Sequence, residues 1–239
     1  MQDSPIHIAN KTVTQFKNSP YREQEWVHRF FGGKHSGYFV DVGANHPVVG
    51  SQTYHLEAAG WRGLLIEPLE SYCTLLRAQR KAPVAQFACS SPANHNRQLR
   101  MLVAGPHSTL NRNPIALGTH SETHIDVPCR TLDAILLDHR VPPGFDFLSI
   151  DIEGHEMEMF RGFSLSKWAP RLVLLEDHVI GHDKHRFMVA NGYQLIMRTG
   201  LNSWYVPRSA AYRLTLRARL QFLRKYWLGL IVRQYKYRR

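Results

Sequence analysis

Short apolar runs that end beside an acidic residue recur along this chain. The first, residues 38–42, contains Asp41 and breaks at Gly43 into a turn of small residues. A buried parallel strand shows this pattern where it enters a tight turn close to a ligand. Three further runs end in the same way, 63–68 at Glu67, 145–151 at Asp151, and 171–175 at Glu176 and Asp177.

Amphipathic stretches with helical spacing lie between these runs. We predict helices over 21–31, 51–59, 71–81, 131–137, 155–162 and 183–191, the second capped by Ser51. Further strands are predicted over 83–89, 98–104, 124–129, 193–197 and 203–206. Strands that alternate with helices predict an α/β fold with a mostly parallel sheet. We interpret 193–206 as a closing hairpin and 93–130 as an inserted β-hairpin, whose loop 105–118 is a candidate substrate lid.

The acidic strand ends predict a functional rim. Parallel strands place their carboxyl ends at one edge of the sheet, where open α/β sheets bind their ligands. Carboxylates gathered at one edge repel each other and cost stability. Four strand ends of this kind therefore indicate a site rather than chance.

Positive charge is concentrated at the C-terminal end. The net charge is +11, and residues 208–239 hold ten Lys or Arg and no acid, while the remainder holds 20 basic and 19 acidic residues. We divide the chain into a polar lead-in (1–20), a nearly neutral body (21–207) and a basic tail (208–239). A nucleic-acid-binding fold more often carries its basic patch on the body, which disfavours a nucleic-acid partner.

The tail also predicts an amphipathic helix. Apolar residues recur at spacings of three and four, at Tyr212, Leu216, Leu220, Leu223, Trp227, Leu230 and Ile231. Arg213, Arg217 and Arg224 flank this stripe, and Tyr226, Trp227 and Tyr235 suit an interface. Such a helix lies in the plane of an anionic membrane. Packing on the domain, packing on a second copy in a homo-oligomer, and binding to nucleic acid stay open as alternatives.

Cysteine use and hydropathy indicate the compartment. Cys73, Cys89 and Cys129 are odd in number and lack metal-ligand spacing, which predicts buried thiols in a reducing compartment. No signal-peptide core opens the chain, and no window approaches the roughly 20 apolar residues that cross a bilayer. We expect a cytoplasmic protein, peripheral on the inner membrane face if the tail docks there.

Glu67 is the candidate ligand for a nucleoside. An acid at the end of the second strand of such folds accepts hydrogen bonds from both ribose hydroxyls. The first turn has one glycine, Gly43, rather than the three of a dinucleotide fingerprint. This argues against a pyrophosphate cofactor and leaves a nucleoside without phosphates; a solvated strand-end residue is the structural alternative.

Three blocks in sequence resemble the FkbM family of S-adenosylmethionine-dependent methyltransferases. They are 39–45 (FVDVGAN), 60–68 (GWRGLLIEP) and 149–156 (SIDIEGHE), and similar segments fall at 131–133 and 202–205. The resemblance covers about residues 27 to 206. Ser149 departs from it, because many family members carry Lys there. The resemblance implies a seven-stranded class I methyltransferase fold of Rossmann-like type, and methyl transfer usually to oxygen, often on sugars or polyketide-like acceptors.

The resemblance also implies the roles of site residues. Asp41, Gly43 and Asn45 would hold the methionine end of S-adenosylmethionine, Glu67 the ribose, and the turn up to Ser90 would lie near adenine. Asp151 would border both cofactor and acceptor. The acceptor is expected to be a sugar-containing or small molecule.

Methyl transfer to a hydroxyl needs a base near the acceptor oxygen. The candidates are Asp151, Glu153, His155, Glu156 and His178. Glu153 has the alternative role of shaping the turn. Glu156 has the alternative role of stabilising the start of the next helix. No metal is expected, although Asp151 with Asp177 is an alternative ligand pair for a hard divalent cation.

Three other functions stay open. An RNA-directed methyltransferase could be anchored by the basic tail, but no Asn/Asp-Pro-Pro-aromatic motif follows the fourth strand. A non-catalytic nucleoside-binding protein of the same fold would not need acids at several strand ends. An NAD-dependent oxidoreductase is disfavoured by the missing glycines.

Overall fold

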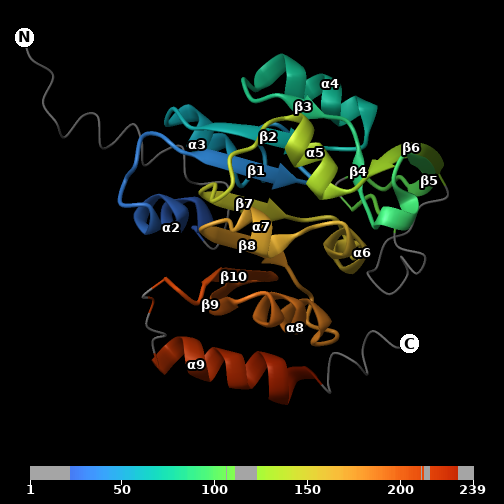
Figure 1. Cartoon of the computed structure of the whole chain (residues 1–239). Coiled ribbons are helices and arrows are strands. Elements are labelled where there is room, and N and C mark those ends of the chain that lie inside the picture. The colour runs from blue at the N-terminus through green and yellow to red at the C-terminus, as the bar shows by residue number, and fades with distance from the viewer. Residues whose placement is uncertain (1–21, 106, 111–122, 211, 213–215, 231–239) are drawn as a thin grey trace, which may run out of the picture.

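A seven-stranded sheet runs through the middle of the protein (Figure 1), and the computed structural model describes residues 22–105, 107–110, 123–210, 212 and 216–230. In spatial order its strands are β3 (Val84–Ala85), β2 (Arg62–Ile66), β1 (Tyr38–Val42), β7 (Phe147–Ile150), β8 (Leu172–Glu176), β10 (Asn202–Pro207) and β9 (Tyr193–Thr199). β3, β2, β1, β7 and β8 are parallel, and β10 is antiparallel to both β8 and β9. The predicted mostly parallel sheet and its closing hairpin are confirmed.

Helices cover both faces of this sheet because alternate strand residues bury against opposite layers. On one face Val40 and Leu148 pack with the helices α5 (Leu132–Asp138), α6 (Glu156–Arg161), α7 (Leu165–Trp168) and α8 (Asp183–Ala190). On the other face Phe39 and Phe147 pack with α2 (Glu23–Phe30), α3 (Tyr54–Ala58) and α4 (Glu70–Gln79). The parallel strands are therefore buried on both sides, as their continuous apolar runs indicate.

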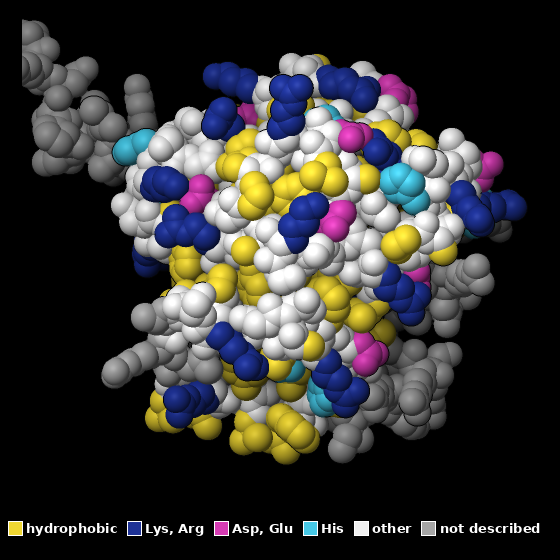
Figure 2. Space-filling view, in the orientation of Figure 1, with side chains coloured by type: hydrophobic (Ala, Val, Ile, Leu, Met, Phe, Trp, Pro, Cys, Tyr) yellow, Lys and Arg dark blue, Asp and Glu magenta, His cyan; other side chains and the backbone are white. Residues whose placement is uncertain are grey.

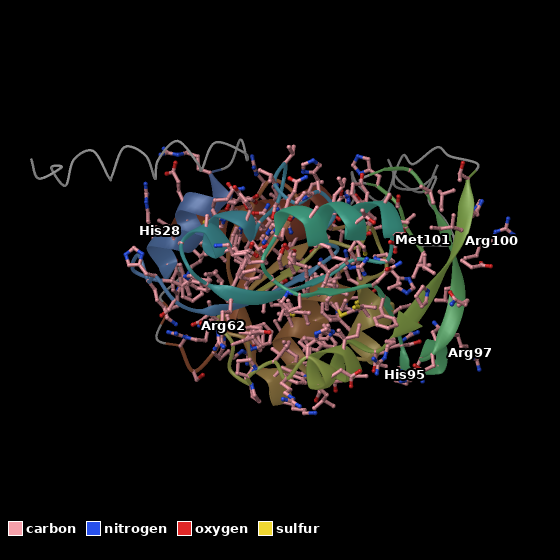
Figure 3. All side chains as sticks on the ribbon, turned by 90° about the horizontal axis from the view of Figure 1, so that it is seen from above. His28, Arg62, His95, Arg97, Arg100 and Met101 are labelled. Atoms are coloured by element: carbon pink, nitrogen blue, oxygen red, sulfur yellow. The ribbon has the colours of Figure 1, made fainter. Side chains whose placement is uncertain are left out.

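A second, three-stranded sheet lies at one end of the molecule. It has the order β4 (Ala88–Cys89), β6 (His124–Arg130) and β5 (Arg97–Leu102), and β5 and β6 are antiparallel. Figure 3 shows Arg97 and Arg100 of β5 at this end, far from His28 and Arg62. Most of the predicted lid, 105–118, lies outside the described residues.

Two predicted elements need correction, and one element was missed. The single strand expected over 83–89 is wrong, because the chain leaves the main sheet after Ala85 and Ala88 joins the second sheet. The helix expected from Ser51 begins at Tyr54, because the Ser51 hydroxyl instead accepts from the backbone N–H groups of Thr53 and Tyr54. The helix α7 was not predicted.

The tail folds back onto the domain through a face that shares only Leu230 with the predicted stripe among the described residues. It forms α9 (Leu216–Phe222), which continues as a π-helical segment η3 (Leu223–Leu228). Tyr226 is buried in the core, and Phe222 and Leu230 pack beside it. The prediction that Tyr226 sits at an outer interface is therefore wrong. Leu216, Leu220, Leu223 and Trp227 point to solvent.

Some predictions fall where the structure gives no description. The lead-in 1–20, Arg213, Ile231 and Tyr235 lie outside the described residues. Cys73, Cys89 and Cys129 are free and buried, as predicted. Among the helices that are described, none combines the length and the apolar character needed to cross a bilayer.

Candidate active site

The turn after β1 brings two strand ends into very close contact. Gly43 has φ of +83°, and a Cβ at this position would lie 1.8 Å from the backbone carbonyl oxygen of Asp151. The Asp151 N–H in turn donates to the Val42 carbonyl at 3.0 Å. Only glycine fits this turn without displacing β7, so the sequence block around Gly43 has a steric cause.

Glu67 is fixed across this turn by backbone donors. Its Oε2 accepts from the Asn45 N–H at 2.9 Å and its Oε1 from the Leu69 N–H at 3.0 Å. Burial raises the pKa of Glu67 to about 7, although these two hydrogen bonds favour its ionised form. Asn45 itself has φ of +50°, so the turn holds a left-handed residue to reach the carboxylate.

A cleft opens beside this carboxylate. Gly43, Asn45 and Glu67 line it together with Asp151, Glu153 and His155, so these six predicted site residues share one cavity. Its apolar wall comes from distant segments, and is made of Ile66, Leu69, Tyr72, Phe87, Ala88, Met101 and Leu110. A cleft with an apolar wall and a few convergent polar groups is the usual form of a small-molecule site.

Ser90 lies behind the cleft rather than in its wall. It is fully buried, and its hydroxyl is 3.1 Å from His155 Nε2 and accepts from Asn94 Nδ2 at 2.9 Å. Burial lowers the pKa of His155 and so favours the neutral form of its ring. Ser90 is thus placed to orient His155, whereas its neighbours Ala88 and Cys89 border the cleft.

Asp41 also lies outside the cleft lining. Its carboxylate is buried and accepts from the Thr53 hydroxyl at 2.6 Å, and Arg80 donates to Thr53 at 3.0 Å. Burial raises the pKa of Asp41, while Thr53 and Arg80 act in the opposite direction. Arg80 is in turn 3.3 Å from Glu57 and 3.1 Å from the Pro47 carbonyl. Asp41 therefore anchors the chain that follows the turn.

The loop after β7 carries a second group of acids to the cleft. Asp151 follows the strand, and Glu153 has φ of +49° and is held by the Thr109 hydroxyl, which donates to its carbonyl at 2.6 Å. His107 Nδ1 lies 2.8 Å from Glu153 Oε1. Burial and the neighbouring acids Glu176 and Glu153 raise the pKa of Asp151 well above its usual value.

Glu176 and His178 join these acids from the end of β8. Glu176 Oε1 lies 3.3 Å from His178 Nε2. The contact with Glu176 raises the pKa of His178, against the effect of burial. Burial acts to raise the pKa of Glu176, but His178, Asp151 and Lys184 together lower it.

Asp177 points to a different set of partners. Its carboxylate accepts from the Tyr226 hydroxyl at 2.8 Å and from the Val179 N–H at 2.9 Å, and lies 3.5 Å from Arg198. The predicted alternative that pairs Asp177 with Asp151 around a cation is therefore wrong.

Two residues of this rim were not predicted as site residues. The sequence marks Glu176 only as a strand-end acid, although this signal could have placed it in the site. Lys184 forms a buried ion pair with Glu156 at 2.7 Å and donates to the Glu176 carbonyl at 2.9 Å. Only the folded chain shows Lys184 in this place, because its partners Glu156 and Glu176 come from other elements and nothing in the first turn of α8 indicates them.

Comparisons with known proteins agree with this geometry. The seven-stranded, mostly parallel sheet with helices on both faces is a mixed α/β fold. The family model for the methyltransferase FkbM domain matches residues 41–196, so the chain belongs to this family. A comparison with curated proteins found no match.

Similar solved structures include methyltransferase FkbM from Methylobacillus flagellatus KT, at 15% identity and a TM-score of 0.47 over 84% of this chain. The chain spans 59% of the length of that structure. Precorrin-6y C5,15-methyltransferase from Geobacter metallireducens GS-15 is 11% identical, with a TM-score of 0.41, over 80% of this chain and 89% of that one. The N-terminal domain of human METTL16 in complex with SAH is 14% identical, with a TM-score of 0.41, over 77% and 67%.

Proposed function

We propose that this protein transfers a methyl group from S-adenosylmethionine to a hydroxyl of a sugar-containing or small-molecule acceptor. The observation that carries this proposal is the Glu67 carboxylate, oriented by two backbone N–H groups at the edge of the cleft. Each of its oxygens accepts one hydrogen bond from the described residues and can accept another, and two acceptors side by side match the vicinal hydroxyls of a ribose.

The rest of the cleft also fits this cofactor. Gly43 leaves the backbone open where a side chain would fill the turn, which suits the close approach of a ligand. Phe87 and Tyr72 supply an aromatic, apolar wall for an adenine ring. When bound, the cofactor supplies an electrophilic methyl group, which the acceptor oxygen takes as the carbon–sulfur bond breaks and the sulfonium becomes a neutral thioether.

Asp151 is the proposed acceptor of the hydroxyl proton. It lines the cleft next to Gly43, and it stands between the cofactor-binding turn and the acids of Glu153 and Glu176. A base in this place removes the proton as the oxygen attacks, so the product ether forms without a charged oxygen intermediate. His155 is held by Ser90 on another side of the cleft and would position the acceptor.

The electrostatics of the rim favour a neutral acceptor over RNA. Asp151, Glu153 and Glu176 place several carboxylates together, and a phosphate backbone approaching them would be repelled. A sugar hydroxyl has no such penalty. The alternative of a non-catalytic nucleoside-binding protein would leave this cluster of acids without a role.

The outer face of the tail supports docking on an anionic membrane. Leu216, Leu220, Leu223 and Trp227 are exposed on α9 and η3, with Trp227 at 68%. Figure 2 shows apolar side chains beside Lys and Arg along this edge of the molecule. An apolar stripe flanked by cations and no anions is complementary to an acidic lipid surface. The acceptor would then be a lipid-linked glycan.

The test is calorimetry with S-adenosylmethionine and its demethylated product. We expect both to bind the wild-type chain, and Glu67→Ala to weaken binding by about 1.5 to 3 kcal/mol, the range for hydrogen bonds to a charged group. Glu70→Gln is the matched control, because Glu70 is exposed on α4. A folded wild-type protein that binds neither compound would contradict the proposal.

A further inference from the structure

A candidate metal site lies beside the cleft. One ligand atom each from Glu153, Glu176 and His178 can be chosen so that all three lie within 4.8 Å of one another. Glu153 lines the cleft, so a small cation has a path to the site. The three residues come from the ends of two neighbouring strands, β7 and β8, which places them on one rigid edge.

Glu176 gives an independent indication of a missing cation. The residue is 7% exposed, and no hydrogen-bond donor reaches its Oε2 within the part of the chain that the structure describes. A buried carboxylate oxygen without a partner is costly, and a bound cation would supply the missing partner.

The backbone is strained at one ligand and directly after another. Glu153 has φ of +49° and Val179, which follows His178, has φ of +52°. Non-glycine residues are uncommon at such angles, and a β-branched residue such as Val179 is rarer still. Hydrogen bonds from Thr109 to the Glu153 carbonyl and from the Val179 N–H to Asp177 keep both turns in place.

We propose that Glu153, Glu176 and His178 bind a divalent transition-metal cation of the Mn²⁺ type. Two carboxylates with one imidazole suit such an ion, since Mg²⁺ prefers an all-oxygen shell. This inference replaces the expectation of a metal-free site. Three protein ligands leave open positions. The role of the cation rests on the proposed function: an acceptor hydroxyl bound there would lose its proton more readily, to Asp151.

The experiment is a titration of the full chain with MnCl₂, in which the electron paramagnetic resonance signal of free Mn²⁺ reports binding. We expect one Mn²⁺ per chain. Glu176→Gln and His178→Gln should each weaken binding by about tenfold or more, since even outer partners of metal ligands change affinity by 10- to 100-fold. Glu158→Gln, on the exposed side of α6, should leave it unchanged.

Binding weaker than about 1 mM by the wild-type chain would overturn the proposal. Equal binding by all the variants would also overturn it, because the ion would then sit elsewhere. If Glu176→Gln does not fold, as judged by circular dichroism, Glu153→Gln decides in its place. The readout does not involve methyl transfer. A protein that binds S-adenosylmethionine but not Mn²⁺ would therefore contradict the metal site and leave the proposed function standing.

Discussion

Glu67 sets the pH range over which the cleft is expected to bind its cofactor. Its pKa of about 7 means that the carboxylate carries a proton in mildly acidic solution. Ionised oxygens accept hydrogen bonds from ribose hydroxyls more strongly than a protonated carboxyl does. Affinity for the demethylated cofactor should therefore fall by about tenfold from pH 8 to pH 6. Glu67→Gln has no titrating carboxyl at this position, so its affinity should not change over this range. An equally constant affinity of the wild-type protein would contradict the role of Glu67.

Gly43 is predicted to be irreplaceable for a steric reason. In Gly43→Ala the new Cβ would lie 1.8 Å from the Asp151 carbonyl oxygen, so the turn would have to shift. The alanine would also be strained by the φ of +83°. We expect a loss of more than about 3 kcal/mol in the free energy of unfolding. Gly144→Ala is the control, because Gly144 has φ of +73° with nothing within 4 Å of its added Cβ. Urea unfolding curves that show equal losses for the two variants would refute the close-approach argument.

At this scale the sequence predicted which residues line the cleft better than it predicted their contacts. Gly43, Glu67 and Asp151 were found because a strand end followed by a turn is a local pattern. Asp41 and Ser90 were expected in contact with the cofactor, but the structure buries them behind the cleft against Thr53 and His155. Those partners lie 12 and 65 residues away, and nothing in the local sequence indicates them.

Among the secondary-structure elements, the C-terminal helix reaches the buried end of the sheet through the Tyr226 hydroxyl. Tyr226 donates to Asp177 at 2.8 Å, inside a buried cluster with Arg198 and Ser203. Tyr226→Phe should lower the free energy of unfolding by about 1.5 to 3 kcal/mol, because a buried charged acceptor loses its donor. The exposed Tyr212→Phe should have no measurable effect. Thermal unfolding of the two variants is the measurement, and equal melting temperatures would contradict the docking of this helix.

The exposed stripe on α9 and η3 can be tested without removing the helix. The double variant Leu220→Gln, Trp227→Gln should bind vesicles of acidic lipid at least about tenfold less than wild type, since each apolar side chain gives about 1.5 to 3 kcal/mol on burial. Leu137→Gln, an exposed leucine on α5, is the control. Co-sedimentation should also weaken at high salt. If the wild-type protein does not bind acidic vesicles but forms dimers, the stripe packs against a second copy instead of a membrane.

Element types were predictable from periodicity, whereas pairing partners were not. The strands β1, β2, β7 and β8 follow from continuous apolar runs. The run 83–89 has the same character, yet it divides between two sheets. The apolar character of a run does not determine which strand it pairs with. The tail stripe was found, but the helix has a second apolar face of Phe222 and Tyr226 that binds the domain.

Over the whole molecule, the charge is divided between two regions with different expected partners. The rim gathers carboxylates at the carboxyl edge of the sheet, while the sequence from 208 to 239 holds ten cations and no acid. A polyanionic acceptor would be attracted to one region and repelled by the other. A neutral acceptor would not be repelled by the rim, and an anionic surface that carries it would attract the cations of the tail.

The transfer of a labelled methyl group tests this account most directly. Cell extract divided into lipid, glycan and RNA fractions would be incubated with labelled S-adenosylmethionine and either wild-type protein or Asp151→Asn. We expect label in a glycan or glycolipid fraction, and a loss of labelling rate of about 100-fold or more with Asp151→Asn at unchanged cofactor affinity. Label found only in RNA, or in no fraction although the folded protein binds the cofactor, would contradict it.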